Sequence, residues 1–277
     1  MKDTNEEQFI RKKERNLECI RRFCLMDDMF LSTVFQNREC TALLLRLILN
    51  RDDLTVEEVR TQRGMQNLWG RAARLDILAV DKDGKYYNIE VQRRDEGAAP
   101  RRARYYSALL DTNITEPGED FENLAETYVI FITENDVLGA DKPLYHIDRI
   151  IRETNADFKD DAHIIYVNSK IQDETALGKL MHDMYCTDPD DMNYKILADE
   201  VRYYKEDTKG VSKVCKIMQE ILDEERVEQA QAIAFKLATR GDSVNEIADM
   251  VGYDVKTVKT WLGNQTSANS VPPSMQV

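Results

Sequence analysis

The sequence predicts an α/β fold in which helices flank a mixed central sheet, followed by a helical C-terminal region. Helical spacing of apolar residues over residues 1–50 is one observation behind this prediction. A second is a set of strand-like runs, of which a hairpin at about 75–92 and the apolar segments ETYVIFIT and AHIIYVNS are the clearest. The third is a helical, acidic pattern from Asp173 to Arg240. Helices before, between and after strands indicate layers that share one core.

The elements follow in order from local patterns. Apolar residues at helical spacing predict helices in residues 1–50, and residues 54–68 are expected to form a first strand and an irregular link. The hairpin comes next. Pro100 is expected in the first turn of a helix, where its missing N–H would have no partner in any case. The boundaries we expect are a core over 1–170, an acidic helical region over 171–240, a short helical motif over 241–263 and a disordered tail over 264–277.

Composition favours a soluble globular protein, since 42% of the 277 residues are hydrophobic and 32% are charged. No apolar run approaches the length of a membrane span, and the N-terminus lacks the apolar centre of a signal peptide. We therefore expect a cytoplasmic protein with no membrane partner. The five cysteines form no CxxC pair and the three histidines have no metal-ligand spacing, so no zinc site is expected.

The charge distribution is uneven. The chain carries −13 overall, but residues 60–104 contain eleven Lys or Arg and six Asp or Glu, a local charge of +5. This stretch indicates either a surface that attracts a polyanion or an ordinary solvated surface, and charge alone leaves both open.

The hairpin LDILAVDKDGKYYNIEVQRR contains two acids, Asp76 and Glu90. A two-residue turn at 83–84 would direct their side chains to opposite faces of the sheet. A three-residue loop at 82–84 would instead place them directly opposite one another, with Gly84 at the position that needs a left-handed backbone. In that register both carboxylates can bind one Mg²⁺ ion, which prefers oxygen ligands.

A simpler explanation of the pair stays open. Isolated acidic patterns arise by chance in surface strands. An acid within an apolar run does need a partner, because an unpaired buried carboxylate is costly. Arg74 or Arg104 could be that partner without any metal ion.

The motifs Asp76, Glu90-Val91-Gln92 and Arg104-Tyr105-Tyr106-Ser107, with the N-terminal segment FQNRECTALLLRLILN, resemble the Rpn family of recombination-promoting nucleases and transposases. That family belongs to the PD-(D/E)XK nuclease superfamily, and the resemblance covers about residues 25–170. It implies a restriction-endonuclease-like core and a Mg²⁺-dependent DNA endonuclease associated with recombination or transposition. Mn²⁺ is the alternative ion.

The resemblance also implies roles for individual residues. Asp76 and Glu90 would bind the metal ion, and Gln92 would complete the catalytic set at the position of the superfamily's lysine. Glu39 is the candidate for an additional acid. Two departures are evident: Leu75 stands where the name of the superfamily has proline, and Gln92 cannot carry a positive charge. Its amide can still orient a water molecule.

DNA is the expected partner, and association into a homodimer is left open. We expect phosphate or DNA contacts from four arginines of the basic stretch, namely Arg74, Arg93, Arg101 and Arg104. One alternative is a catalytically weak or inactive DNA-binding or regulatory protein derived from a mobile element, which Gln92 would allow. Another is a protein-interaction module built on the acidic helices.

Residues 238–262 resemble a helix-turn-helix. Ser243 and Glu246 have the spacing of a capping box, and Gly252 lies between two short amphipathic segments. Lys256 and Lys259 are then expected on the outward face, where a recognition helix contacts DNA. The alternative is an ordinary helical hairpin that closes the C-terminal layer.

Overall fold

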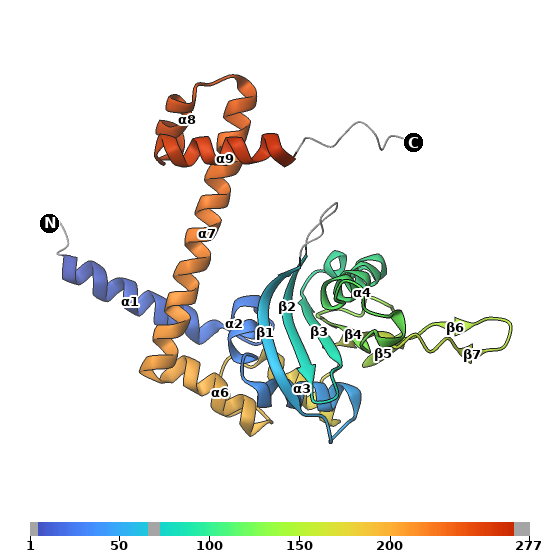
Figure 1. Cartoon of the computed structure of the whole chain (residues 1–277). Helices are drawn as coiled ribbons and strands as arrows, with labels where there is room; N and C mark the ends of the chain where they lie inside the picture. Colours follow the sequence, from blue (N-terminus) through green and yellow to red (C-terminus); the bar gives the residue numbers. More distant parts are fainter. Residues whose placement is uncertain (1–4, 66–72, 269–277) are drawn as a thin grey trace, which may run out of the picture. The chain divides into compact units, whose positions relative to one another are not determined.

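The computed structural model describes residues 5–65 and 73–268 and divides the chain into two compact units, Met1–Val214 and Cys215–Val277 (Figure 1). The first unit contains the α/β core and the second is helical. Helix α7 (Thr208–Arg240) begins in the first unit and continues into the second. The end of the expected link at 66–68 lies outside the described residues.

A mixed six-stranded sheet forms the centre of the first unit, as the sequence predicts. Its strand order is β1-β2-β3-β4-β8-β5. Strands β3, β4 and β8 are parallel, and the remaining neighbours are antiparallel. The strands of this sheet are β1 (Val56–Met65), β2 (Ala73–Asp81), β3 (Tyr86–Gln92), β4 (Thr127–Thr133), β5 (Leu144–Ile147) and β8 (Ala162–Asn168). Two short strands, β6 (Ile150–Ile151) and β7 (Ala156–Asp157), pair with each other in a separate ribbon.

Helices cover both faces of the sheet (Figure 1). One face is covered by α2 (Asp28–Val34) and α3 (Arg38–Leu49), which follow α1 (Asn5–Arg22). The other face is covered by α4 (Pro100–Ile114), whose first residue is the predicted proline. The arrangement is consistent with a restriction-endonuclease-like fold.

The face of the sheet beneath α4 contains an apolar cluster. Leu78, Phe131 and Tyr166 come from the strands, while Tyr106 and Leu110 come from α4. Alternate residues of a strand share a face of the sheet. Helix α4 therefore covers Leu78 and the residues an even number of positions away from it on β2, together with their partners on β3. Asp76 and Glu90 belong to that alternation, so both lie on the face of the sheet that α4 covers.

A buried lysine connects the helices that follow the sheet to the N-terminal helices. The ammonium group of Lys205, near the end of α6 (Lys195–Glu206), donates to the backbone carbonyls of Arg21, Phe23 and Thr187. Helix α6, together with α5 (Ala176–Tyr185), therefore belongs to the first unit. That unit continues to Val214, beyond the boundary expected at residue 170.

The second unit contains most of α7, from Cys215 onward, with α8 (Val244–Val251) and α9 (Val255–Ala268). Helix α9 continues past the expected boundary at residue 263, so residues 264–268 are helical. The rest of the expected tail, residues 269–277, lies outside the described residues. Within the described chain, no helix combines the length and apolar character needed to cross a membrane.

Candidate active site

Three residues, 82–84, lie between Asp81 and Lys85, the last bonded pair of the β2–β3 hairpin, and this loop length decides how the hairpin pairs. Val80 pairs with Tyr86 and Ile77 pairs with Ile89. Beyond Val80, the backbone N–H of Asp81 donates to the carbonyl oxygen of Lys85 over 3.1 Å. Gly84 has a φ of 78°, the left-handed conformation that the three-residue loop needs. The three-residue register is therefore confirmed, and the two-residue alternative is wrong.

This register brings Asp76 and Glu90 together. The backbone N–H of Asp76 donates to Glu90 Oε1 over 3.4 Å, and the backbone N–H of Val91 donates to Asp76 Oδ2 over 3.1 Å. Glu90 is only 1% exposed, and Asp76 is partly buried. Each carboxylate thus contacts the backbone of the other strand.

The two carboxyl groups are poorly compensated by positive charge. Burial raises the pKa of Asp76 to about 7, although the Val91 N–H, Arg102 and Arg74 act in the opposite direction. Burial and the neighbouring Asp76 raise the pKa of Glu90 well above its usual range. A pair of carboxyls that resists ionisation in this way is stabilised in its charged form by a bound cation.

A third acid, Asp28, influences the pair and was missed by the sequence analysis. It is the first residue of α2, and its negative charge contributes to the raised pKa of Asp76. Burial, followed by the charge of Asp27, raises the pKa of Asp28 itself. Glu39, the expected additional acid, is exposed at the start of α3, where its backbone N–H donates to Asn37 Oδ1. The signal that could have identified Asp28 is an acid at the start of a strongly apolar helix, DMFLSTV.

The arginine of α4 that acts on the pair is Arg102. Its guanidinium donates to the Tyr106 hydroxyl over 2.8 Å and lies 5.1 Å from the centre of that ring. It lowers the pKa of both Asp76 and Glu90. Arg101 and Arg104, which the sequence analysis favoured, are exposed on α4. Helical geometry explains the difference, because Arg102 shares a helix face with the buried Tyr106 four residues later.

The other two predicted arginines have different surroundings. Arg74 is exposed and lowers the pKa of the nearby Asp76. Arg93 forms ion pairs with Asp27 over 2.9 Å and with Glu134 over 3.5 Å. Arg93 therefore connects the start of α2 to the end of β4, and a DNA contact from it would compete with these two acids.

Gln92 extends toward the turn that precedes α4. A methyl group on Gly97, within the 3₁₀ turn Asp95–Ala98, would collide with Oε1 of Gln92. The absence of a side chain at Gly97 thus leaves room for the amide of Gln92 on the face that carries Glu90. No pattern in the sequence singles out Gly97.

The family model for PD-(D/E)XK nuclease family transposases matches residues 32–229, which is more than half of the chain. The chain belongs to this family. Neither a curated protein nor a solved structure matches it. Membership indicates a nuclease role with DNA as the substrate, and PD-(D/E)XK nucleases generally use divalent metal ions.

The donor set fits the divalent ion that PD-(D/E)XK nucleases use. Asp76 and Glu90 offer carboxylate oxygens, which suit a hard cation such as Mg²⁺. Asn88 lies two residues before Glu90 and is fully buried, and its amide has no partner at hydrogen-bond geometry among the described residues. That amide is nevertheless close enough to Glu90 to lower the pKa of its carboxyl. Unsatisfied polar atoms beside two carboxylates are expected where a cation and its water molecules bind.

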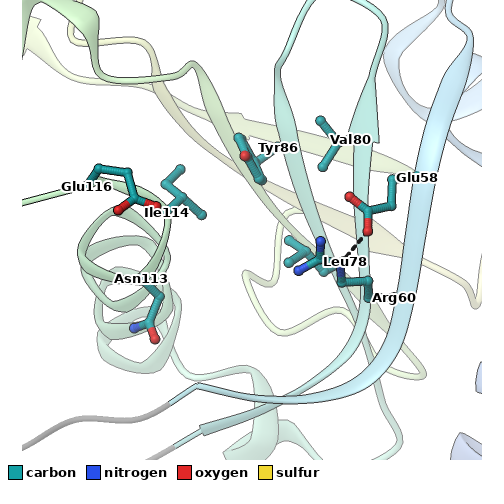
Figure 2. Close-up of a pocket in the computed structure, with 8 residues that line it drawn as sticks. All are labelled: Glu58, Arg60, Leu78, Val80, Tyr86, Asn113, Ile114 and Glu116. Atoms are coloured by element: carbon teal, nitrogen blue, oxygen red, sulfur yellow. Dashed lines mark hydrogen bonds and ion pairs between the residues drawn. The ribbon is translucent and has the colours of Figure 1, made fainter. Parts of the chain in front are cut away.

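A small cavity of about 180 Å³ lies farther along the same hairpin (Figure 2). In Figure 2 Arg60 and Glu58 of β1 form an ion pair at one side, and Asn113 of α4 lies opposite. Leu78 and Val80, which line it, continue the alternation of Asp76 toward the loop. The PD-(D/E)XK carboxylates do not line this cavity.

A second cluster corrects the expectation that no histidine has metal-ligand spacing. His182, Asp183 and Cys186 of the α5 region bring one potential ligand atom each within 4.8 Å of the others. Asp183 is fully buried, and its carboxylate accepts hydrogen bonds from the backbone N–H groups of Asn193 and Tyr194, both over 2.8 Å. These bonds give the cluster a structural role between α5 and α6. The i, i+4 spacing of His182 and Cys186 was the signal that the sequence analysis passed over.

Proposed function

We propose that the chain is a Mg²⁺-dependent DNA endonuclease that hydrolyses phosphodiester bonds in recombination or transposition. The observation that carries this proposal is the opposition of Asp76 and Glu90 across the β2–β3 ladder. Glu90 is buried and Asp76 partly buried, and both lie on the face of the sheet that α4 covers. The positive charge nearby is too small to keep their pKa values at the usual level. Family membership supports the same reaction class.

Each residue has a distinct part in the proposed reaction. Asp76 and Glu90 hold the divalent ion, which supplies Lewis acidity and lowers the pKa of a bound water when it is present. The amide of Gln92 accepts a hydrogen bond from the attacking water and so orients it. Arg102 donates hydrogen bonds to the phosphate, and Arg74 adds positive charge at the start of β2.

Asp28, the first residue of α2, is a third acid near the pair. Its negative charge contributes to the raised pKa of Asp76, which supports a place beside the proposed ion. We propose that it binds the ion or a water of its hydration shell, because Mg²⁺ usually retains several waters that need acceptors. Asp28 and Glu39 are both exposed, but it is Asp28 whose charge raises the pKa of Asp76.

A second candidate function is a DNA-binding regulator with little or no turnover. The observation in its favour is Gln92, which supplies neither a cation nor a base where the superfamily has lysine. Under this candidate the carboxylates still bind metal, but cleavage is absent.

Cleavage of supercoiled plasmid tests the proposal, since a closed circle offers no ends to an exonuclease. We expect Mg²⁺- or Mn²⁺-dependent nicking that Asp76→Asn and Glu90→Gln each reduce about a thousandfold, equivalent to several kcal/mol of lost transition-state stabilisation. Asp83→Asn is the matched control, because Asp83 is exposed in the loop of the same hairpin. Unchanged cleavage by Asp76→Asn would refute the site.

Calorimetric titration with Mg²⁺ separates the two candidates. Metal binding that Asp76→Asn abolishes, together with plasmid cleavage, supports the endonuclease. Metal binding without cleavage by the wild-type chain supports the regulator instead.

A further inference from the structure

The second unit lies largely beyond the family match, which ends at residue 229. Its described residues form most of α7 followed by α8 and α9, which fold together in Figure 1. None of the residues proposed for hydrolysis belongs to this unit. The second unit therefore has a role other than holding the residues proposed for hydrolysis.

The turn between α8 and α9 is built from specific backbone bonds. Ser243 and Glu246 form the expected capping box, since each backbone N–H donates to the other side chain. Gly252 ends α8 in the left-handed conformation, with a φ of 74°. Asp254 then begins α9, because its carboxylate accepts from the backbone N–H of Thr257 over 2.9 Å. A three-residue turn with glycine between two short helices is the connection of a helix-turn-helix.

A small core fixes which face of α9 points outward. Ala234 of α7, Ile247 and Ala248 of α8 and Val258 of α9 are buried together. On the same side, Trp261 of α9 packs against this core. The opposite face of α9 presents an exposed set of polar side chains, Lys256, Lys259 and Thr260.

The charges of the unit leave this face positive. Helix α9 has two lysines and no acid in its sequence. Three acids of the unit bond to other groups: Asp254 with Thr257, Glu246 with Ser243, and Asp242 with Arg240. Asp249 of α8 is exposed. Among the described residues, no carboxylate forms an ion pair with Lys256 or Lys259.

We propose that α9 is a recognition helix that enters the major groove of duplex DNA and selects the sequence to which the chain binds. Lys256 and Lys259 contact phosphate oxygens or base edges, and Thr260 lies on the face that meets the bases. This proposal goes beyond hydrolysis and does not require it, because duplex recognition by the second unit is independent of the carboxylates in the first.

The test uses the full chain with Asp76→Asn throughout and EDTA present, so that no cleavage enters the measurement. The probe is a library of duplexes with a random segment about 20 base pairs long, roughly two helical turns. The enriched duplex and a scrambled one are then compared by fluorescence anisotropy at several salt concentrations. Four forms are measured: the parent, Lys256→Gln with Lys259→Gln, the charge-conserving Lys256→Arg with Lys259→Arg, and the control Lys216→Gln with Lys236→Gln. The control removes the same charge from exposed positions of α7.

We expect the parent to enrich a sequence motif. The α9 variant should bind the enriched duplex about tenfold more weakly. The slope of log affinity against log salt concentration should become smaller in magnitude by about 2, because each phosphate contact contributes roughly 0.9 to that slope. The α7 control should retain both values. Circular dichroism checks that the variants keep their helices. A charge-conserving pair, Lys256→Arg with Lys259→Arg, should keep the salt slope while changing the enriched motif.

Three results would each overturn the proposal: no enrichment by the parent, equal affinity of the parent and the α9 variant, or an equal loss in the α7 control. The second would identify the unit as an ordinary helical hairpin. Because cleavage is never measured, failure here is distinct from failure of the proposed endonuclease, which the plasmid assay decides.

Discussion

The amide oxygen of Gln92 occupies the space that a side chain on Gly97 would need. Gly97 belongs to the 3₁₀ turn just before α4, and the absence of a side chain there lets the Gln92 amide lie against this turn. The residue at the position of the superfamily's lysine thus has its present side-chain position because its neighbour has no side chain.

Gly97→Ala should therefore lower cleavage by about tenfold, or ~1.4 kcal/mol of transition-state stabilisation, by displacing the Gln92 amide. Gln92→Ala should have a similar effect, and the double variant should be no worse than Gln92→Ala alone. Single-turnover plasmid cleavage measures all three. Gly64→Ala is the control, because a methyl group there has open space. Additive losses would mean that Gly97 acts by another route.

Asp28→Asn should weaken Mg²⁺ binding by roughly tenfold to a hundredfold, the usual effect of removing a supporting acid from a metal site. Removal of Asp28 also lowers the pKa of Asp76, and this change alone would favour Mg²⁺ binding. A loss of affinity in Asp28→Asn would therefore reflect the missing carboxylate. Calorimetric titration with Mg²⁺ gives the affinities. Glu39→Gln serves as the comparison and should bind Mg²⁺ like the wild type. If Glu39→Gln weakened Mg²⁺ binding and Asp28→Asn did not, Glu39 would be the additional acid.

Arg102→Gln should move the acidic limb of the pH–rate profile to higher pH. Arg102 lowers the pKa of Asp76 and Glu90, so its removal makes both carboxyls harder to ionise, and a metal ion needs them ionised. We expect a several-fold loss of cleavage near neutral pH that diminishes as the pH rises. Arg104→Gln, on the exposed face of α4, provides the control. A loss that stays constant across pH would assign Arg102 to phosphate contact alone.

Metal-free protein should become less stable as the pH rises through about 7. The pKa of Asp76 is raised in the folded state, so its contribution to stability is fully present at low pH, where the carboxyl is protonated in both states. That contribution is lost as the pH passes the folded pKa. Asp76→Asn does not ionise, and it should therefore exceed the wild type in unfolding free energy by on the order of 2–4 kcal/mol at about pH 8.5, with little difference at about pH 3.

Urea unfolding in EDTA at several pH values measures this difference, and Asp83→Asn should follow the wild type throughout. Saturating Mg²⁺ should reduce the advantage of Asp76→Asn, because the ion stabilises the ionised pair only in the folded wild type. An advantage that is independent of pH would contradict the assignment to ionisation.

Local patterns were sufficient for much of the fold. The strand alternation of LDILAV, the glycine at the third loop position and Pro100 at the start of α4 each act through near neighbours, and the structure agrees with all three. The boundary expected at residue 170 differs from the unit that continues to Val214, because Lys205 bonds to carbonyls about 180 residues earlier in the chain. No local pattern reports a contact of that kind.

The same distinction applies to the candidate site. Asp76 and Glu90 could be paired from the hairpin alone. Asp28 reaches them only through the packing of α2 on the sheet, and Arg102 was separable from Arg101 and Arg104 only once the buried face of α4 was known. Gly97 carries no chemistry that a search for functional side chains would notice.

The length of the β2–β3 loop has a genetic consequence. Strand alternation has a period of two, so the loss of one codon between positions 82 and 84 would favour a two-residue turn and turn Glu90 away from Asp76. Asp76 and Glu90 would both remain in the encoded protein and the hairpin could still form. A lineage could therefore lose nuclease activity through one in-frame deletion, although a search for the acidic residues of the motif would still find both of them.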